Sequence, residues 1–80
     1  MADALRALTS LAAGQTATLV ELRLPSDARA RLQELGLVTG TSIQLVRFAP
    51  LGDPVEIHLR GYYLSLRRHE AEQILVETTA

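Results

Sequence analysis

The feature that most constrains this chain is a stiff turn between two runs of strand-forming residues. The turn extends from Pro50 to Pro54 and reads Pro-Leu-Gly-Asp-Pro. Proline, glycine and aspartate favour tight turns, so the flanking residues are expected to form a hairpin. Such a turn needs no apolar residue, yet Leu51 lies at its crown. Two interpretations stay open: Leu51 covers a small core, or it docks on a partner.

Short strands joined by tight turns are expected over most of the chain. Apolar and polar residues alternate over 55–59, which is typical of a half-buried strand. The adjacent Leu45 and Val46 break such alternation, which predicts a bulge or a strand covered on both faces. Of the consecutive Tyr62 and Tyr63, one is expected in the core and the other at the surface. The expected strands are 17–24, 42–48, 55–59, 62–66 and 74–76.

One amphipathic helix is expected after the first of these strands. Pro25 breaks the strand, and Ser26 is the predicted N-cap because its hydroxyl can accept a hydrogen bond from the first helical turn. Gly36 ends the helix. Shorter helical turns are predicted over 3–8, where two leucines lie three apart, and over 67–72. The residues expected on the buried face of the main helix are Ala28, Leu32 and Leu35.

This order of elements predicts a small closed sheet. A small antiparallel sheet removes its edges by curling into a barrel. We therefore expect a mainly β fold of the α+β class, an SH3-like small barrel with a short amphipathic helix inserted after the first strand. The 80 residues are expected to form a single domain, 1–80.

Composition and motifs argue against several kinds of function. Eight basic and nine acidic residues give a net charge of −1, which offers no electrostatic footprint for nucleic acid. There is no cysteine, hence no thiol nucleophile and no disulfide. Phosphate-binding loops and catalytic constellations are missing, so no enzyme is expected. No apolar run is long enough for a membrane span and no signal peptide is recognisable, so the chain is expected to be cytoplasmic.

The two histidines are weak candidates for metal ligands. His58 lies two residues from Glu56, and His69 adjoins Glu70 and is near Glu72. The glutamates Glu70 and Glu72 are expected at the surface. Histidine and carboxylate together can bind a divalent first-row metal, but a metal site usually needs three or four converging ligands. We therefore assign no metal site and expect no cofactor. His58, His69 and Glu70 are retained only as candidates for weak divalent metal binding.

A short basic segment has two interpretations. Arg67, Arg68 and His69, with Arg60 nearby in the sequence, would form a patch for an acidic partner or for lipid headgroups. Alternatively, the glutamates that follow would balance these charges in an ordinary solvated turn.

Three motifs in a fixed order resemble the FeoA family. Any one of them alone would be weak evidence, but their combination at this spacing is specific. The resemblance covers about 11–77, which is expected to be the core of the domain. The motifs are RLQELGL at 31–37 with Gly40, VR at 46–47 with APLGDP at 49–54, and LSLRR at 64–68 with Ala71.

The resemblance implies an SH3-like barrel and a cytoplasmic accessory role in bacterial ferrous iron transport. It implies a partnership with FeoB, a membrane permease with a cytosolic GTP-binding domain, through which the chain would lie at the inner membrane. The chain is then a protein–protein interaction module. The residues expected to contact the partner are Arg47, Leu51, Gly52, Asp53, Pro54, Arg67 and Arg68.

Other functions are kept as alternatives. In a metal-responsive domain, one histidine with neighbouring glutamates would bind Fe(II) and drive dimerisation or signalling. An RNA-binding small barrel rests on fold analogy alone, and the near-neutral charge counts against it. Weak self-association through a strand edge and a dependence on the partner's nucleotide are not decided by the sequence.

Overall fold

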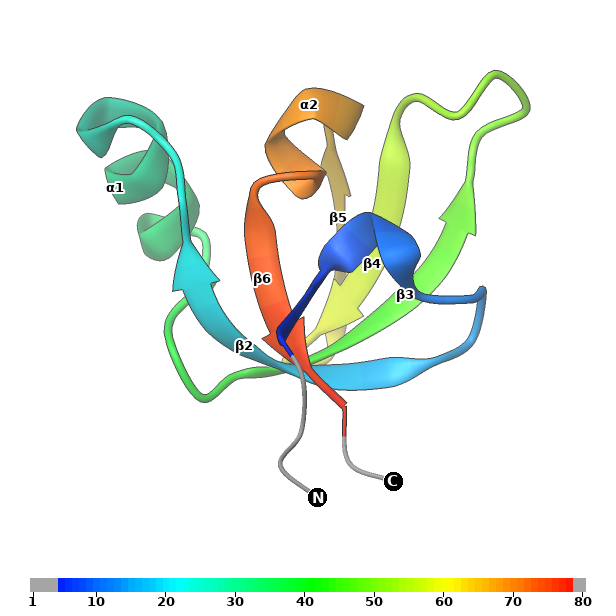
Figure 1. Cartoon of the computed structure of the whole chain (residues 1–80), viewed down its shortest axis with the longest axis horizontal. Helices are drawn as coiled ribbons and strands as arrows, with labels where there is room; N and C mark the ends of the chain where they lie inside the picture. The colour runs from blue at the N-terminus through cyan, green and yellow to red at the C-terminus, as the bar shows by residue number, and fades with distance from the viewer. Residues whose placement is uncertain (1–4, 79–80) are drawn as a thin grey trace.

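The computed structural model describes residues 5–78, which form a curled six-stranded antiparallel sheet with short helices at its edges (Figure 1). The strand order is β1-β6-β2-β3-β4-β5. The predicted mainly β architecture with a helix between two strands is therefore confirmed. The elements are β1 Leu5–Ala7, the 3-10 turn η1 Leu8–Ser10, β2 Thr16–Leu22, α1 Ser26–Glu34, β3 Ser42–Phe48, β4 Val55–Leu59, β5 Tyr62–Leu66, α2 Arg68–Ala71 and β6 Ile74–Glu77.

Two irregularities let the sheet curl. The pairing of β3 with β4 shifts register between Leu45 and Arg47, which confirms the predicted bulge at the Leu45–Val46 pair. The pairing of β2 with β6 shifts between Leu19 and Glu21. A bulge bends its strand and increases the local twist, so β2 can pair with β3 along one part and with β6 along another.

The inner face of the curled sheet is one hydrophobic core. Alternate residues of β4 are buried, as its apolar–polar alternation predicts. The helix α1 contributes Leu32, and the segment after it contributes Leu37, both fully buried. The largest buried side chains are Leu8, Leu19, Leu32, Leu37, Ile43, Leu45, Val55, Ile57, Leu59, Leu66, Ile74 and Val76.

The end of α1 differs from the prediction in one residue. Leu35 is exposed, because the helix ends at Glu34 in a Schellman motif. In that motif the amides of Gly36 and Leu37 donate to the carbonyls of Gln33 and Leu32, at 3.0 Å each. Gly36 has the left-handed φ of 108° that this reversal requires, and it turns Leu37 into the core instead of Leu35.

The start of α1 also differs. Ser26 is the first residue of the helix, and Pro25 holds the cap position without any side-chain hydrogen bond. The predicted Ser26 N-cap is therefore wrong. The backbone satisfies the first turn instead, since the Arg29 amide donates to the Pro25 carbonyl at 2.9 Å.

The beginning of the described chain is a strand, so the predicted helical turn over 3–8 is wrong for residues 5–7, whereas Leu8 begins the 3-10 turn η1. Asp3 and Ala4 lie outside the described residues. β1 pairs antiparallel with β6, with Leu5 opposite Glu77. Pairing with an available strand edge satisfies the backbone of so short a segment better than a single helical turn, whose nucleation is costly.

Both tyrosines of β5 are exposed, so the expectation that one lies in the core is wrong. Tyr62 and Tyr63 are 39% and 64% exposed. They lie at the start of an edge strand. Tyr62 instead reaches the end of α1, where its hydroxyl donates a hydrogen bond to the Leu35 carbonyl.

Candidate functional site

The turn between β3 and β4 projects Leu51 into solvent. Leu51 is 96% exposed, so the interpretation that it covers the core is wrong. The turn is closed by two backbone hydrogen bonds, from the Gly52 amide to the Ala49 carbonyl at 2.7 Å and from the Ala49 amide to the Pro54 carbonyl at 3.0 Å. The Asp53–Pro54 peptide is cis, and Gly52 has a φ of 86°.

Arg68 fastens this turn to α2. Its Nη1 donates to the Gly52 carbonyl at 3.2 Å, and its backbone amide donates to Oδ1 of Asp53, also at 3.2 Å. Its guanidinium lies 5.7 Å from the ring centroid of Phe48, and its Nε lies 3.3 Å from Oε2 of Glu72. Arg68 and Asp53 were predicted to contact a partner. The structure shows that both of them hold the turn within the chain.

Two other predicted contact residues have different surroundings. Arg47 pairs across the hairpin with Glu56, Nε to Oε1 at 3.1 Å, and its side chain is largely exposed. Arg67 is exposed beside Arg68 but lines a pocket on the other side of α2 from the turn. Of the two interpretations of the basic segment, a patch that includes Arg60 does not form, because Arg60 lies in the turn before β5 and the whole strand separates it from Arg67.

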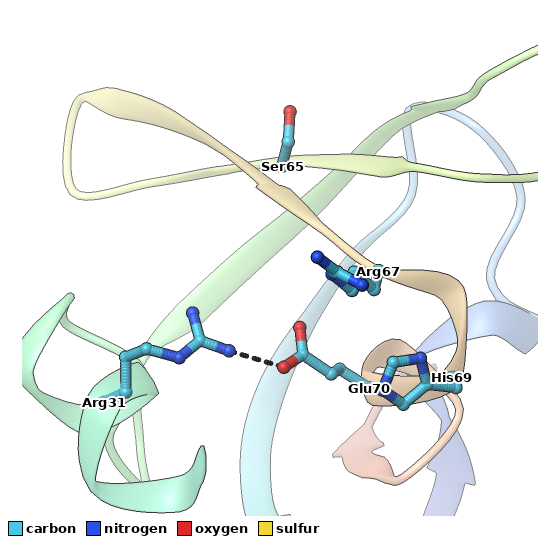
Figure 2. Close-up of a pocket in the computed structure, with 5 residues that line it drawn as sticks. All are labelled: Arg31, Ser65, Arg67, His69 and Glu70. Atoms are coloured by element: carbon cyan, nitrogen blue, oxygen red, sulfur yellow. Dashed lines mark hydrogen bonds and ion pairs between the residues drawn. The ribbon is translucent and has the colours of Figure 1, made fainter.

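The pocket lies between α1 and α2 and has a volume of about 480 Å³ (Figure 2). Its centre is Glu70, which is only 8% exposed and pairs with Arg31 across a distance of 2.5 Å. The expectation that Glu70 is a surface carboxylate is therefore wrong. No local pattern in the sequence links two residues 39 positions apart, so sequence reasoning missed Arg31. The lining residues are Arg31, Ser65, Arg67, His69 and Glu70.

The structure does not gather the candidate metal ligands. His58 lies on β4, where its ring stacks at a tilt against Tyr63 with the centroids 4.8 Å apart. His69 and Glu70 lie on α2 at the pocket. Across residues 5–78, no three histidine, cysteine, aspartate or glutamate side chains are close enough to hold a metal ion together.

The turn and the pocket lie at one end of the molecule. Figure 1 shows α1, α2 and the loop between β3 and β4 projecting from the same end of the sheet. The contacts of Arg68 with the turn join two of these three elements directly. Among the helices of the described chain, none is long and apolar enough to cross a membrane.

Known proteins are similar to this chain in both sequence and fold. The FeoA domain model matches residues 6–78. A fusion of Fe(2+) transport protein A with the Fe(2+) transporter FeoB from Porphyromonas gingivalis is 40% identical over 70 residues, which are 88% of this chain and 8% of that relative's length.

Solved structures of FeoA proteins have the same fold as this chain. FeoA of Chlorobium tepidum superposes with a TM-score of 0.86 and 44% identity, over 91% of this chain and 70% of that one. FeoA of Stenotrophomonas maltophilia, described as a procaryotic SH3 domain protein and solved with zinc, gives a TM-score of 0.70 and 27% identity over 86% of each chain. The predicted SH3-like barrel is thus confirmed, and this chain belongs to the FeoA family, which is associated with ferrous iron transport.

Proposed function

We propose that this chain is a cytoplasmic accessory protein of ferrous iron uptake that docks on a FeoB-type permease and has no enzymatic activity of its own. The fused relative supports the pairing, because it carries Fe(2+) transport protein A and FeoB in one chain. Fusion turns docking into an intramolecular event and raises the effective concentration of the two parts. Docking on the permease would also bring the chain to the inner membrane.

The single observation that carries this proposal is the exposure of Leu51 on a fixed turn. A side chain that is 96% exposed contributes nothing to the core, and burying a leucine on a partner is worth about 1.5–3 kcal/mol. The contacts from Arg68 already hold the turn. Docking therefore loses little conformational entropy in ordering the turn, so most of the free energy of burying Leu51 is available for binding.

Regulation of the permease follows from differential affinity. A docked protein shifts a conformational equilibrium only as far as it binds one state better than the other. We therefore expect its affinity to differ between permease loaded with GDP and permease loaded with a non-hydrolysable GTP analogue. This difference measures how strongly the accessory protein biases the transport cycle.

The test is retention of full-length, detergent-solubilised permease by a tagged copy of this chain, in both nucleotide states. Leu51→Asp should abolish retention and reduce Fe(II) uptake in cells. The matched control is Tyr63→Asp on β5, which also replaces an exposed large hydrophobic side chain by a charged one. Urea unfolding shows that each variant is folded. Retention of the permease by folded Leu51→Asp with normal uptake would refute the assignment.

The metal-responsive alternative gains no support from the described residues, which gather no three ligand side chains. It makes a distinct prediction that is simple to check. Anaerobic calorimetry with Fe(II) would give saturable heat if this chain were a sensor, whereas a docking module should give none.

A further inference from the structure

The pocket between α1 and α2 has more positive charge than its own carboxylate balances. Arg31 and Arg67 supply two guanidinium groups, and Glu70 supplies one carboxylate. Arg31 donates to Glu70 only through Nη2. Within residues 5–78, the side chain of Arg67 takes part in no ion pair or hydrogen bond. One positive charge and most of the guanidinium donors therefore face the opening without a protein partner.

The pocket is also held in shape. Figure 2 shows Arg31 reaching from α1 to Glu70, with the Arg67 guanidinium across the opening and the Ser65 hydroxyl turned away from both. Glu70 is largely buried, so it fixes the direction of Arg31. The Arg31 side chain is still 55% exposed, which leaves its other N–H groups accessible. A guanidinium that is already oriented loses less entropy when it binds a ligand.

We propose that this pocket binds one carboxylate, the side chain of an aspartate or glutamate of the docking partner, between Arg31 and Arg67. The planar forks of guanidinium groups match a carboxylate or a phosphate with paired hydrogen bonds. This inference rests on the proposed function, because the carboxylate comes from the protein that covers Leu51.

The position of the pocket favours a protein carboxylate over other anions. Arg67 lines the pocket, and its neighbour Arg68 bonds to Gly52 in the turn. Because Arg67 and Arg68 are consecutive, the pocket and the turn both adjoin the start of α2. A single protein surface reaches both. A polyanion such as a membrane surface or a nucleic acid needs several unbalanced cations, and the chain has a net charge of −1.

The two contacts divide the work of recognition. Leu51 supplies apolar burial, which has no direction, whereas a paired carboxylate fixes the orientation of one surface on the other. A partner without an acidic residue at the matching position would cover the Arg67 guanidinium and leave it unpaired, which weakens the wrong complex.

The first experiment uses the isolated chain, so it does not depend on the permease. The arginine Nε–Hε signals are followed by NMR during titration with sodium glutarate, with sodium phosphate and with sodium chloride at matched ionic strength. Glutarate should shift the signals of Arg31 and Arg67 saturably, and Arg67→Gln should abolish the shift. The matched control is Arg60→Asn, which removes one charge at the other end of β5 and suits the left-handed φ of 47° at that position.

Each other outcome overturns the proposal. No saturable shift with either anion removes the site. Phosphate binding about tenfold tighter than glutarate binding, a difference of about 1.4 kcal/mol, would assign the pocket to phosphate groups. Binding to phosphatidylglycerol vesicles that Arg67→Gln abolishes, without a glutarate shift, would assign it to a lipid surface.

The second experiment uses the full-length permease. Arg67→Gln should raise the Kd for the permease about tenfold, and Arg67→Lys should recover only part of the loss because it restores charge without the fork. Arg60→Asn should leave the Kd unchanged. If Leu51→Asp prevents docking and Arg67→Gln does not, the pocket assignment fails while the proposed function stands. If the wild-type chain does not dock at all, the proposed function fails, and the glutarate titration alone judges the pocket.

Discussion

Replacing Arg68 by alanine should loosen the Leu51 turn while leaving the core intact. The variant loses the hydrogen bond from Nη1 to the Gly52 carbonyl, worth about 0.5–1.5 kcal/mol. It also loses the contact with the Phe48 ring, worth about 0.5–1 kcal/mol at an exposed site. The ion pair with Glu72, four residues along α2, adds about 0.3–0.5 kcal/mol. The bond from the Arg68 backbone amide to Asp53 does not depend on the side chain and should persist.

The expected loss of stability is about 1–2 kcal/mol. It is less than the sum of the single contributions, because the Arg68 side chain is 44% exposed and its contacts share one group. In a domain of this size the loss corresponds to a decrease in Tm of roughly 4–16 °C. Urea unfolding measures the free energy, and native-state amide exchange measures the turn itself. The amides of Ala49 and Gly52 should exchange faster, whereas core amides should change only by the global loss.

The matched control is Arg47→Ala, which removes another exposed arginine and its ion pair with Glu56 from the same hairpin but leaves the turn fastened. It should cost no more than about 1 kcal/mol, with exchange at Gly52 following only the global stability. The reasoning is refuted if Arg68→Ala changes neither the unfolding free energy nor the exchange of Ala49 and Gly52 relative to this control.

Four further substitutions check other parts of the structure, each by urea unfolding. Leu32→Ala should cost about 2–5 kcal/mol, since Leu32 is fully buried; a loss below about 1 kcal/mol would mean that α1 does not pack as described. Gly36→Ala should cost at least about 1 kcal/mol, because its φ of 108° disfavours any side chain, and an unchanged midpoint would contradict the Schellman motif. Glu70→Gln should cost about 1 kcal/mol by weakening the pair with Arg31; equal stability in Arg31→Gln, Glu70→Gln and the wild type would show that the pair contributes nothing.

The sequence predicted the strands from β3 to β5 well because their signals are local. The alternation over Val55–Leu59, the turn residues on both sides of it and the Leu45–Val46 pair each act within a few residues. The errors occur where pairing with a distant strand, or the backbone geometry of a helix end, overrides the preference read from the residue pattern. The edge of β6 draws Leu5–Ala7 into a strand, and the Schellman motif turns Leu37 rather than Leu35 inward.

The candidate site follows the same division. The turn that carries Leu51 was recognisable because prolines, a glycine and an aspartate specify it in one short segment, but the sequence left open whether Leu51 is exposed. The pairing of Arg31 with Glu70 was not, since the two residues are 39 positions apart and meet only when α1 and α2 come together. The role of Arg68 in holding the turn was missed for a related reason, because its acceptor at Gly52 lies 16 positions earlier.

The antiparallel pairing of β1 with β6 determines how this fold can be attached to other molecules. Leu5 lies opposite Glu77, so the backbone enters and leaves the described fold side by side. β6 runs from the α2 end of the sheet toward Glu77, so the start of β1 and the end of β6 lie at the opposite end of the sheet from α2 and the loop between β3 and β4 (Figure 1). A linker, a purification tag or a second domain joined at either side therefore starts far from the proposed docking surface. The barrel can therefore be joined to a longer polypeptide without covering α2 or the loop between β3 and β4.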